Sequence, residues 1–244
     1  MPTWEVMAGS TSGRISGATG NRYTPLAGEV QWQLADALED RTQDQVYASY
    51  TWANLYIRVT GYSLSASAPV TSRKNAVDGN MTVTIDGTGV FQDTVNTDSV
   101  VNGDLLNFKT VFPATGTLTA AMFGSTLQGS TNTTLAVTSS EFSQGSATTK
   151  FLPYGGSVSN AASYDTETDI QYTVRRATTY SNLRIFVEPN NLNGNTTVNL
   201  QVNTLAGNQT VTIGASTTGE VEDTVNTDAV VAGDEINYKE VTLG

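Results

Sequence analysis

The chain contains no cysteine and no histidine among its 244 residues. Their absence excludes thiol nucleophiles, serine–histidine and cysteine–histidine pairs, and metal sites built from imidazole or thiolate ligands. A pair of carboxylates, as in glycoside hydrolases, is the main catalytic arrangement that remains. No local motif for such a pair is present. We therefore predict no enzymatic activity, no catalytic residues, no cofactor and no resident metal.

Positive charge is also scarce. The chain has 12 lysines and arginines against 23 acidic residues, which gives a net charge of −11 and a pI near 4.3. The densest basic stretches are two pairs, Arg73 with Lys74 and Arg175 with Arg176, and their place in alternating segments predicts solvated strand faces. Because an acidic surface repels phosphate backbones, we expect no nucleic-acid partner.

Long apolar runs are missing as well. No stretch approaches the ~18 apolar residues that a membrane span requires. The first residues have neither the basic start nor the apolar run of a signal peptide. A chain without cysteine fits synthesis in a reducing cytosol. We expect a protein made in the cytoplasm, with no membrane partner.

The sequence does contain a long internal repeat of two copies. The block from Asp93 to Lys109 returns almost unchanged from Asp223 to Lys239, at an offset of 130 residues. Upstream, Asn54 to Val59 matches Asn182 to Val187 at an offset of 128. Two copies of so long a period indicate tandem globular domains, because solenoids repeat shorter units at least three times. We predict two units: 1–140, with an N-terminal arm at 1–20, and 141–244.

Short alternating runs separated by glycine, asparagine, serine and proline predict an all-β protein. Leu55, Ile57 and Val59 alternate with polar neighbours, so they are expected to share one buried face. In each copy a hairpin is expected, with its turn at Gly79 and Asn80 or the equivalent Gly207 and Asn208. Residues 34–44 are expected to form a loop before a strand. Each unit fits a two-sheet sandwich of the jelly-roll kind, with an immunoglobulin-like topology as the alternative.

Comparing the two copies also identifies inward positions of the last shared strand. Leu106 and Phe108 stay apolar in the second copy, as Ile236 and Tyr238. The residues that alternate with them do not stay apolar. We therefore expect the positions that stay apolar in both copies to face the core and the alternating positions to face solvent. The outward set is Leu105, Glu235, Asn107 and Asn237.

The two copies differ at their C-terminal ends. After Lys109 the first continues through two more strand-like runs, 117–123 and 134–137, whereas the second has no matching runs. Unit two is therefore expected to lack its last strand and to carry an open sheet edge, which natural β proteins avoid. The segment from Thr3 to Met7 is a candidate to fill that edge, from the same chain or from a neighbour. The alternative is that the edge packs against the other domain.

One repeated motif carries oxygen ligands at close spacing, which could bind Ca²⁺. It lacks the Asp-x-Asp-x-Asp-Gly order and the bidentate glutamate of a calcium loop. Asp and Asn beside short strands commonly cap turns through their own side chains, and this interpretation is favoured. The residues are Asp93, Asn96, Asp98 and Asp104, repeated as Asp223, Asn226, Asp228 and Asp234.

Three tryptophans also allow two interpretations. Trp4, Trp32 and Trp52 could form a platform for sugar stacking, or they could pack in a core or an interface. Trp52 precedes a core strand and matches Tyr180 in the second copy. This match favours packing.

The order of these motifs resembles a β-sandwich module of structural proteins from tailed bacteriophages and related viruses. The resemblance covers about 54–109 and 182–239. It is similar in kind to the jelly-roll capsid decoration, or cement, proteins, which sit on the outer shell as trimers and clamp neighbouring capsomers. The resemblance implies a virion structural protein on the capsid exterior, a homotrimer, with the major capsid protein shell as its partner.

Two other functions remain open. Two sandwiches in one chain is also the architecture of a double jelly-roll major capsid protein, although the chain is short and its loops are modest. A tandem carbohydrate-binding or receptor-binding module of a phage fibre is the other alternative. Paired exposed aromatics at equivalent loop positions would favour it, and the repeat does not show them. An enzyme ranks last, because it would need two carboxylates in a cleft.

Overall fold

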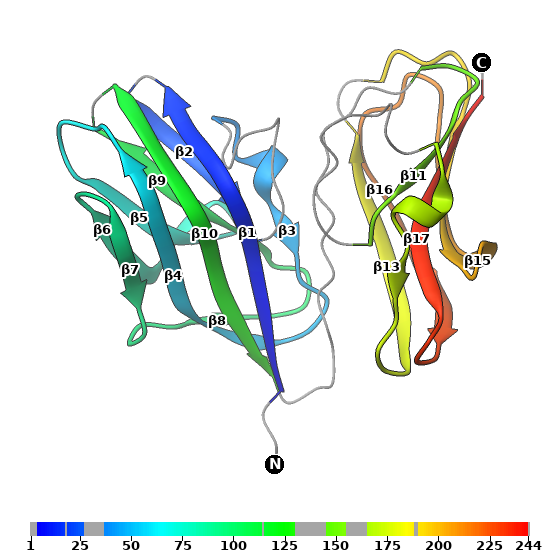
Figure 1. Cartoon of the computed structure of the whole chain (residues 1–244), viewed down its shortest axis with the longest axis horizontal. Coiled ribbons are helices and arrows are strands. Elements are labelled where there is room, and N and C mark those ends of the chain that lie inside the picture. Colours follow the sequence, from blue (N-terminus) through cyan, green and yellow to red (C-terminus); the bar gives the residue numbers. More distant parts are fainter. Residues whose placement is uncertain are drawn as a thin grey trace. The chain divides into compact units, whose positions relative to one another are not determined.

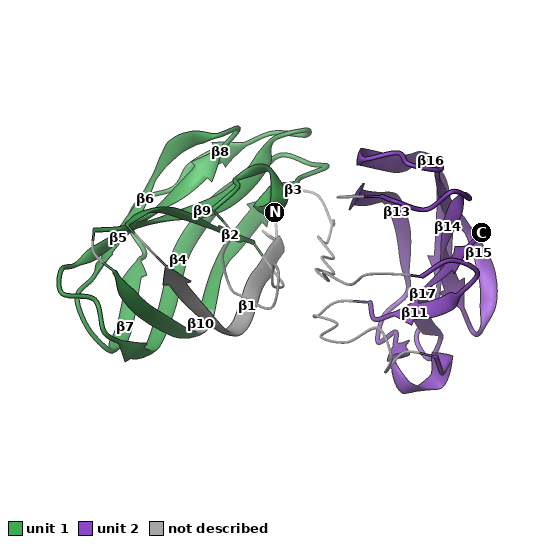
Figure 2. Ribbon diagram, turned by 90° about the horizontal axis from the view of Figure 1, so that it is seen from above, with its two compact units in different colours: residues 1–141, 155–157 green, residues 142–154, 158–244 purple. Residues whose placement is uncertain are grey.

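The computed structural model describes residues 4–17, 19–26, 37–113, 115–129, 145–154, 165–187 and 190–243. These residues form an all-β protein of antiparallel strands with two short 3-10 turns, as predicted (Figure 1). No helix in the described ranges is long and apolar enough to cross a membrane. The chain divides into two compact units, one of 1–141 with 155–157 and one of 142–154 with 158–244 (Figure 2).

The described residues of unit one form two sheets. In the first, β8 (Asp98–Val100) pairs with β4, and the other strands follow the order β1 (Trp4–Gly17), β10 (Gly116–Gly129), β4 (Tyr50–Tyr62), β7 (Gly89–Asp93). In the second, β3 (Asp44–Gln45) pairs with β9, and the others follow the order β2 (Gly20–Pro25), β9 (Leu105–Phe112), β5 (Ala68–Lys74), β6 (Val77–Ile85). A 3-10 turn, η1 (Asp40–Thr42), precedes β3.

The core of unit one is aromatic at its centre. The ring centroids of Trp52 and Phe108 are 5.1 Å apart, and those of Phe108 and Phe123 are 4.9 Å apart. All three side chains are fully buried, as are Leu55 and Ile57 of β4. The predicted inward face of residues 55, 57 and 59 and the preference for packing at Trp52 are confirmed. Trp32 lies outside the described residues, and of Trp4 only the backbone is described.

The N-terminal segment belongs to unit one. Strand β1 pairs with β10 along its length, from Trp4 opposite Gly129 to Gly17 opposite Gly116. The prediction that Thr3 to Met7 fills the edge of unit two is therefore wrong for residues 4–7, and Thr3 lies outside the described residues. Residues 4–17 form a strand instead of an arm, because β10 is long enough to pair with them while its other edge pairs with β4.

Two further expectations change. Asn107 and Asn237 are fully buried instead of outward-facing, and Asn107 donates to the hydroxyl of Thr42 at 2.8 Å. The hairpins exist in both copies, but their turns are at Asn75–Ala76 and Asn203–Thr204, where φ is positive. Gly79 lies inside β6, where a Cβ atom would be 2.4 Å from a carboxylate oxygen of Asp98. Its glycine is needed for that close approach and not for a turn.

The described residues of unit two form a five-stranded sheet and a two-stranded one. In the larger sheet β12 (Tyr172–Thr173) pairs with β17, and the order is β11 (Thr149–Leu152), β17 (Glu235–Thr242), β14 (Thr196–Val202), β15 (Leu205–Ile213). The smaller sheet pairs β13 (Thr178–Val187) with β16 (Gly219–Val230). A 3-10 turn, η3 (Glu167–Asp169), precedes β12. The strand-like run at 134–137 lies outside the described residues.

The pattern of strand pairing within unit one is repeated within unit two, with one difference. Strand β5 lies between β6 and β9, and β14 lies between β15 and β17 in the same way. Strand β4 pairs with β7 and β8 on one side, as β13 pairs with β16. On its other side β4 pairs with β10, whereas β13 has no second strand partner among the described residues.

We expect Phe123→Ala to destabilise unit one by about 3–5 kcal/mol, because it removes a fully buried ring from the centre of the core. Urea unfolding followed by tryptophan fluorescence measures this, since all three tryptophans lie in unit one. Val90→Ala in the same unit is the control, because that side chain is 54% exposed. If both variants lower the free energy of unfolding equally, or Phe123→Ala does not lower it, the ring of Phe123 does not stabilise the core as expected.

Candidate functional site

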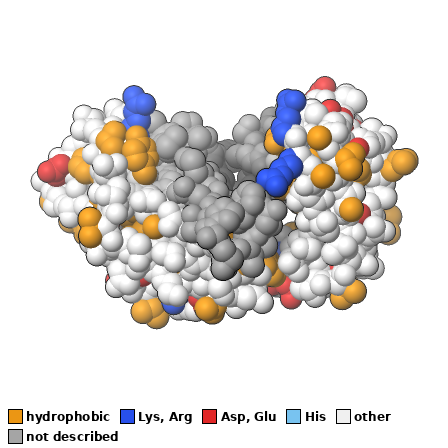
Figure 3. Space-filling view, turned by 90° about the horizontal axis from the view of Figure 1, so that it is seen from below, with side chains coloured by type: hydrophobic (Ala, Val, Ile, Leu, Met, Phe, Trp, Pro, Cys, Tyr) orange, Lys and Arg blue, Asp and Glu red, His pale blue; other side chains and the backbone are white. Residues whose placement is uncertain are grey.

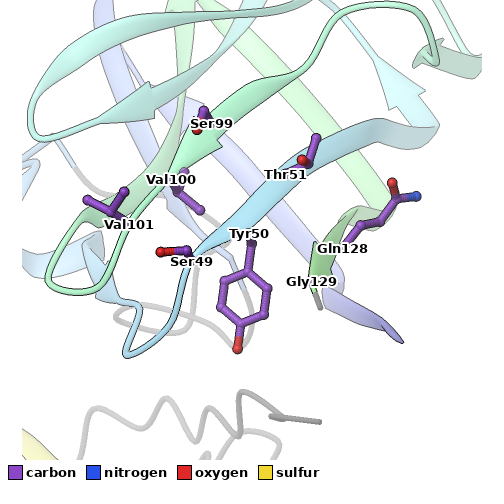
Figure 4. A pocket seen from close by; sticks show the side chains of 8 residues that line it. All are labelled: Ser49, Tyr50, Thr51, Ser99, Val100, Val101, Gln128 and Gly129. Carbon is purple, nitrogen blue, oxygen red and sulfur yellow. The ribbon is translucent and has the colours of Figure 1, made fainter. Parts of the chain in front are cut away.

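A shallow hollow of about 420 Å³ opens at one end of the first sheet of unit one. It crosses three neighbouring strands, since β8 and β10 both pair with the beginning of β4. Figure 4 shows its lining, which is Ser49, Tyr50, Thr51, Ser99, Val100, Val101, Gln128 and Gly129. A Cβ atom at Gly129 would be 2.9 Å from Cδ1 of Tyr50, so the glycine lets this ring pack against the strand end.

The chemistry of the hollow is polar and uncharged. Hydroxyls, one amide and the ring of Tyr50 line it, with two valines, and none of the described residues that line it is acidic or basic. Such a lining can hydrogen-bond and pack against a neutral polar ligand, but it offers no group for proton transfer at neutral pH. Sequence reasoning missed this hollow, because its three segments lie far apart in the chain and none carries a motif.

The repeated Asp/Asn segments are capped by their aspartates in both units, as a turn between β7 and β8 in unit one and as an irregular stretch inside β16 in unit two. A carboxylate oxygen of Asp93 accepts from the backbone N–H groups of Val95 and Asn96, at 3.1 and 3.0 Å. Its other oxygen accepts from the N–H of Thr82 in β6 at 2.9 Å. Asp223 accepts in the same way from Val225, Asn226 and Thr210.

The second acidic pair fastens the same loops to the neighbouring hairpin. Asp98 accepts from the backbone N–H of Asn80 at 2.8 Å, and Asp228 accepts from those of Asn208 and Gln209 at 2.6 and 2.9 Å. The third pair, Asp104 and Asp234, caps the turn before β9 and β17. Carboxylate oxygens that already accept several N–H groups are poor cation ligands. The geometry therefore agrees with turn capping.

Within the described ranges, no three acidic side chains gather in a way that suits a metal ion. Burial opposes ionisation of Asp93, but hydrogen bonds from Asn96, Thr82 and Val95 outweigh it and lower the pKa of the carboxyl to about 2. The backbone hydrogen bonds from Asn226 and Thr210 similarly lower the pKa of Asp223. Both groups are thus held as anions to cap their loops.

Each capped loop presents an exposed valine. Val95 and Val225 are both 84% exposed, although the aspartates beside them are buried. Two further apolar positions, Val101 with Val231 and Val77 with Leu205, are also exposed in both units. Single exposed apolar side chains are ordinary on protein surfaces, so the feature to explain is their repetition at equivalent positions of the two units. The face in Figure 3 shows scattered apolar side chains and few charged ones.

Unit two contains a cluster of tyrosines where unit one has closed core. The ring of Tyr154 lies 5.0 Å from Tyr180, 5.7 Å from Tyr172 and 6.3 Å from Tyr238. Burial raises the pKa of Tyr154, Tyr180 and Tyr238. The sequence contained a signal for this cluster, because Trp52 and Phe108 are replaced by tyrosines at the matching positions.

The first basic pair is engaged with acidic side chains, and Lys74 lies 3.9 Å from Asp104. The guanidinium of Arg73 contacts Glu39 at 2.8 Å and Asp78 at 2.6 Å, and Lys109 also contacts Asp78 at 2.6 Å. The Arg73 side chain is only 11% exposed, so the prediction of a solvated face is wrong there. A loop residue distant in sequence, Glu39, covers it. Arg175 and Arg176 are exposed, as expected.

Comparison with known proteins identifies no family. No family model matches the chain, and no curated protein matches it. A solved structure described as an "anti-sigma factor domain-containing protein" aligns over 96% of this chain and 88% of that chain. The identity is 9% and the TM-score is 0.20. A likeness at this level carries no argument about fold or function.

We expect Asp93→Asn to lower the stability of unit one at pH 7 by about 1–3 kcal/mol, because backbone donors lose a charged acceptor. The folded pKa of about 2 lies below the ordinary value of 3.8, so the stabilisation is complete above about pH 4. It is lost as the pH falls toward 2. The difference between variant and wild type should therefore shrink across that window.

The measurement is urea unfolding at several pH values, followed by tryptophan fluorescence. Asp86→Asn is the matched control, because Asp86 is exposed. A difference between Asp93→Asn and wild type that stays constant from pH 7 to 2 would contradict the proposed role of the charge.

Proposed function

We propose that this chain is a virion structural protein, and specifically a capsid decoration protein that binds the outer surface of an icosahedral shell. In this proposal the two units are jelly-roll sandwiches derived by internal duplication. The major capsid protein shell is the partner, the assembly is a homotrimer, and neither nucleic acid nor membrane is bound. The support comes from the resemblance of the repeated motifs, the acidic charge and the lack of histidine and cysteine.

The observation that carries the proposal is the exposed valine of each capped segment. Val95 lies in the turn between β7 and β8 and Val225 in the irregular stretch of β16, in segments of the same sequence with the same aspartate caps, and both are equally exposed. One chain thus offers two equivalent apolar contacts. A shell presents the same surface many times, so two linked contacts gain avidity without any new interaction. This arrangement suits an adaptor on a repeating lattice.

A co-sedimentation assay with shells of the virus that encodes the chain tests the proposal. We expect Val95→Asp or Val225→Asp alone to weaken binding moderately, and both together to reduce it by about 100-fold or more, since linked sites act together. Val90→Glu is the control, because Val90 is 54% exposed and its counterpart in unit two is Glu220. If the wild type does not sediment with shells, or the double variant sediments as well as wild type, the proposal fails.

A trimer is expected in solution. The chain has a mass of 25.8 kDa, so light scattering should give about three times this value. A stable monomer would contradict the trimeric decoration role and favour an independent binding module.

The hollow in unit one favours a second candidate, a carbohydrate-binding or receptor-binding module. Its uncharged hydroxyl and amide groups beside Tyr50 suit a neutral polar ligand such as a sugar. A glycan screen distinguishes the two functions, because a decoration protein needs no sugar and a fibre module needs no shell.

A further inference from the structure

The two units differ most at one sheet edge. In unit one, β4 is an inner strand, with β10 on one side and β7 and β8 on the other. In unit two, the equivalent β13 pairs with β16 alone within the described part of the chain (Figures 1 and 2). We call the side of β13 away from β16 its outer edge. It corresponds to the side of β4 that β10 occupies.

Among the described residues, the core of unit two is more open on this side of β13 than the core of unit one is beside β4. In unit one, β10 contributes Leu118, Ala120, Phe123 and Leu127, all fully buried. Beneath them Ile57 is fully buried and Val59 nearly so. The matching Ile185 and Val187 are only half-buried. Apolar side chains that one unit covers completely are thus partly in solvent in the other, and exposure of apolar surface to water is unfavourable.

The residues at this opening suit a surface that is covered only in a complex. Tyr154, Tyr180 and Tyr238 take the places of Leu26, Trp52 and Phe108, which are fully buried in unit one. A tyrosine tolerates an environment that is apolar on one side and wet on the other. Tyr172, 46% exposed, extends the same cluster.

We propose that the outer edge of β13 is a docking site for a β-strand of a partner protein. The partner strand runs antiparallel to β13, as β10 does to β4, and pairs with it by backbone hydrogen bonds. Its chemistry follows from β10, which has no charged residue and places apolar side chains over the core. No countercharge is required for Arg184, because Glu220 already pairs with it.

A second copy of β13 would fit this edge less well. Leu183 and Ile185 of β13 pack in the core of their own unit, against Val198 and Val211. Edge-to-edge pairing of two β13 strands would extend the sheet but bring no side chains to cover the opening. A strand whose inward side chains are available for insertion covers both the edge and the opening. The inference concerns unit two alone and stands apart from the proposed role on a capsid.

The probe is a synthetic peptide of residues 116–129, the sequence of β10, with two added lysines for solubility. It is mixed with the full chain, and hydrogen exchange is followed by mass spectrometry. We expect the amides of 178–187 to exchange about tenfold more slowly with the peptide, and those of 50–62 to be unchanged, because β4 already has both neighbours. A control peptide with Leu118→Asp and Phe123→Asp should give no protection.

A variant of the protein completes the test. Ile185→Glu places a charge at the opening and should abolish the protection by the peptide, while exchange in β15 and β17 reports that unit two is still folded. The inference is overturned if the peptide leaves 178–187 unchanged. It is also overturned if that segment is fully protected in dilute protein without peptide, or if its protection grows with protein concentration alone. Shell binding through Val95 and Val225 is measured separately, so either proposal can fail without the other.

Discussion

In unit one, the rings of Trp52, Phe108 and Phe123 meet between two sheets, and burial of this apolar surface holds together strands from the whole unit. Each ring comes from a different strand, β4, β9 and β10. The third is decisive, because β10 closes the core and also gives β1 an edge to pair with. A unit without β10 would therefore expose both the backbone groups at the edge of β4 and the side chains of the core.

The described part of unit two has no strand equivalent to β10 beside β13, and its core is correspondingly more open. Its larger sheet keeps the pairing of its counterpart, while its smaller sheet has two strands in the described residues. The core positions change in the direction that partial exposure favours, from tryptophan and phenylalanine to tyrosine at 180 and 238. A repeated fold thus has two different surfaces, one closed by its own strands and one suited to an incoming strand.

The buried aspartates serve a separate purpose. Asp93 and Asp223 each accept hydrogen bonds from several backbone N–H groups and fix a short segment whose valine faces solvent, a turn in unit one and part of β16 in unit two. Fixing the loop in advance lowers the entropy lost on binding, so a single exposed side chain gives more affinity than it would on a flexible turn. Because both units carry this arrangement, the exposed valine is presented twice, which is the basis of the proposed binding to a repeating shell.

The sequence by itself determined the all-β class, the repeat and the inward faces at 55, 57 and 59, because side chains alternate across a strand with period two. It also indicated turn capping by Asp93 and Asp223, since that chemistry is local. Tertiary structure decided the rest. The place of residues 4–17 beside β10, the burial of Asn107 under Thr42 and the cover of Arg73 by Glu39 each depend on segments distant in sequence. The hollow at Tyr50 joins three such segments, so no local pattern encodes it.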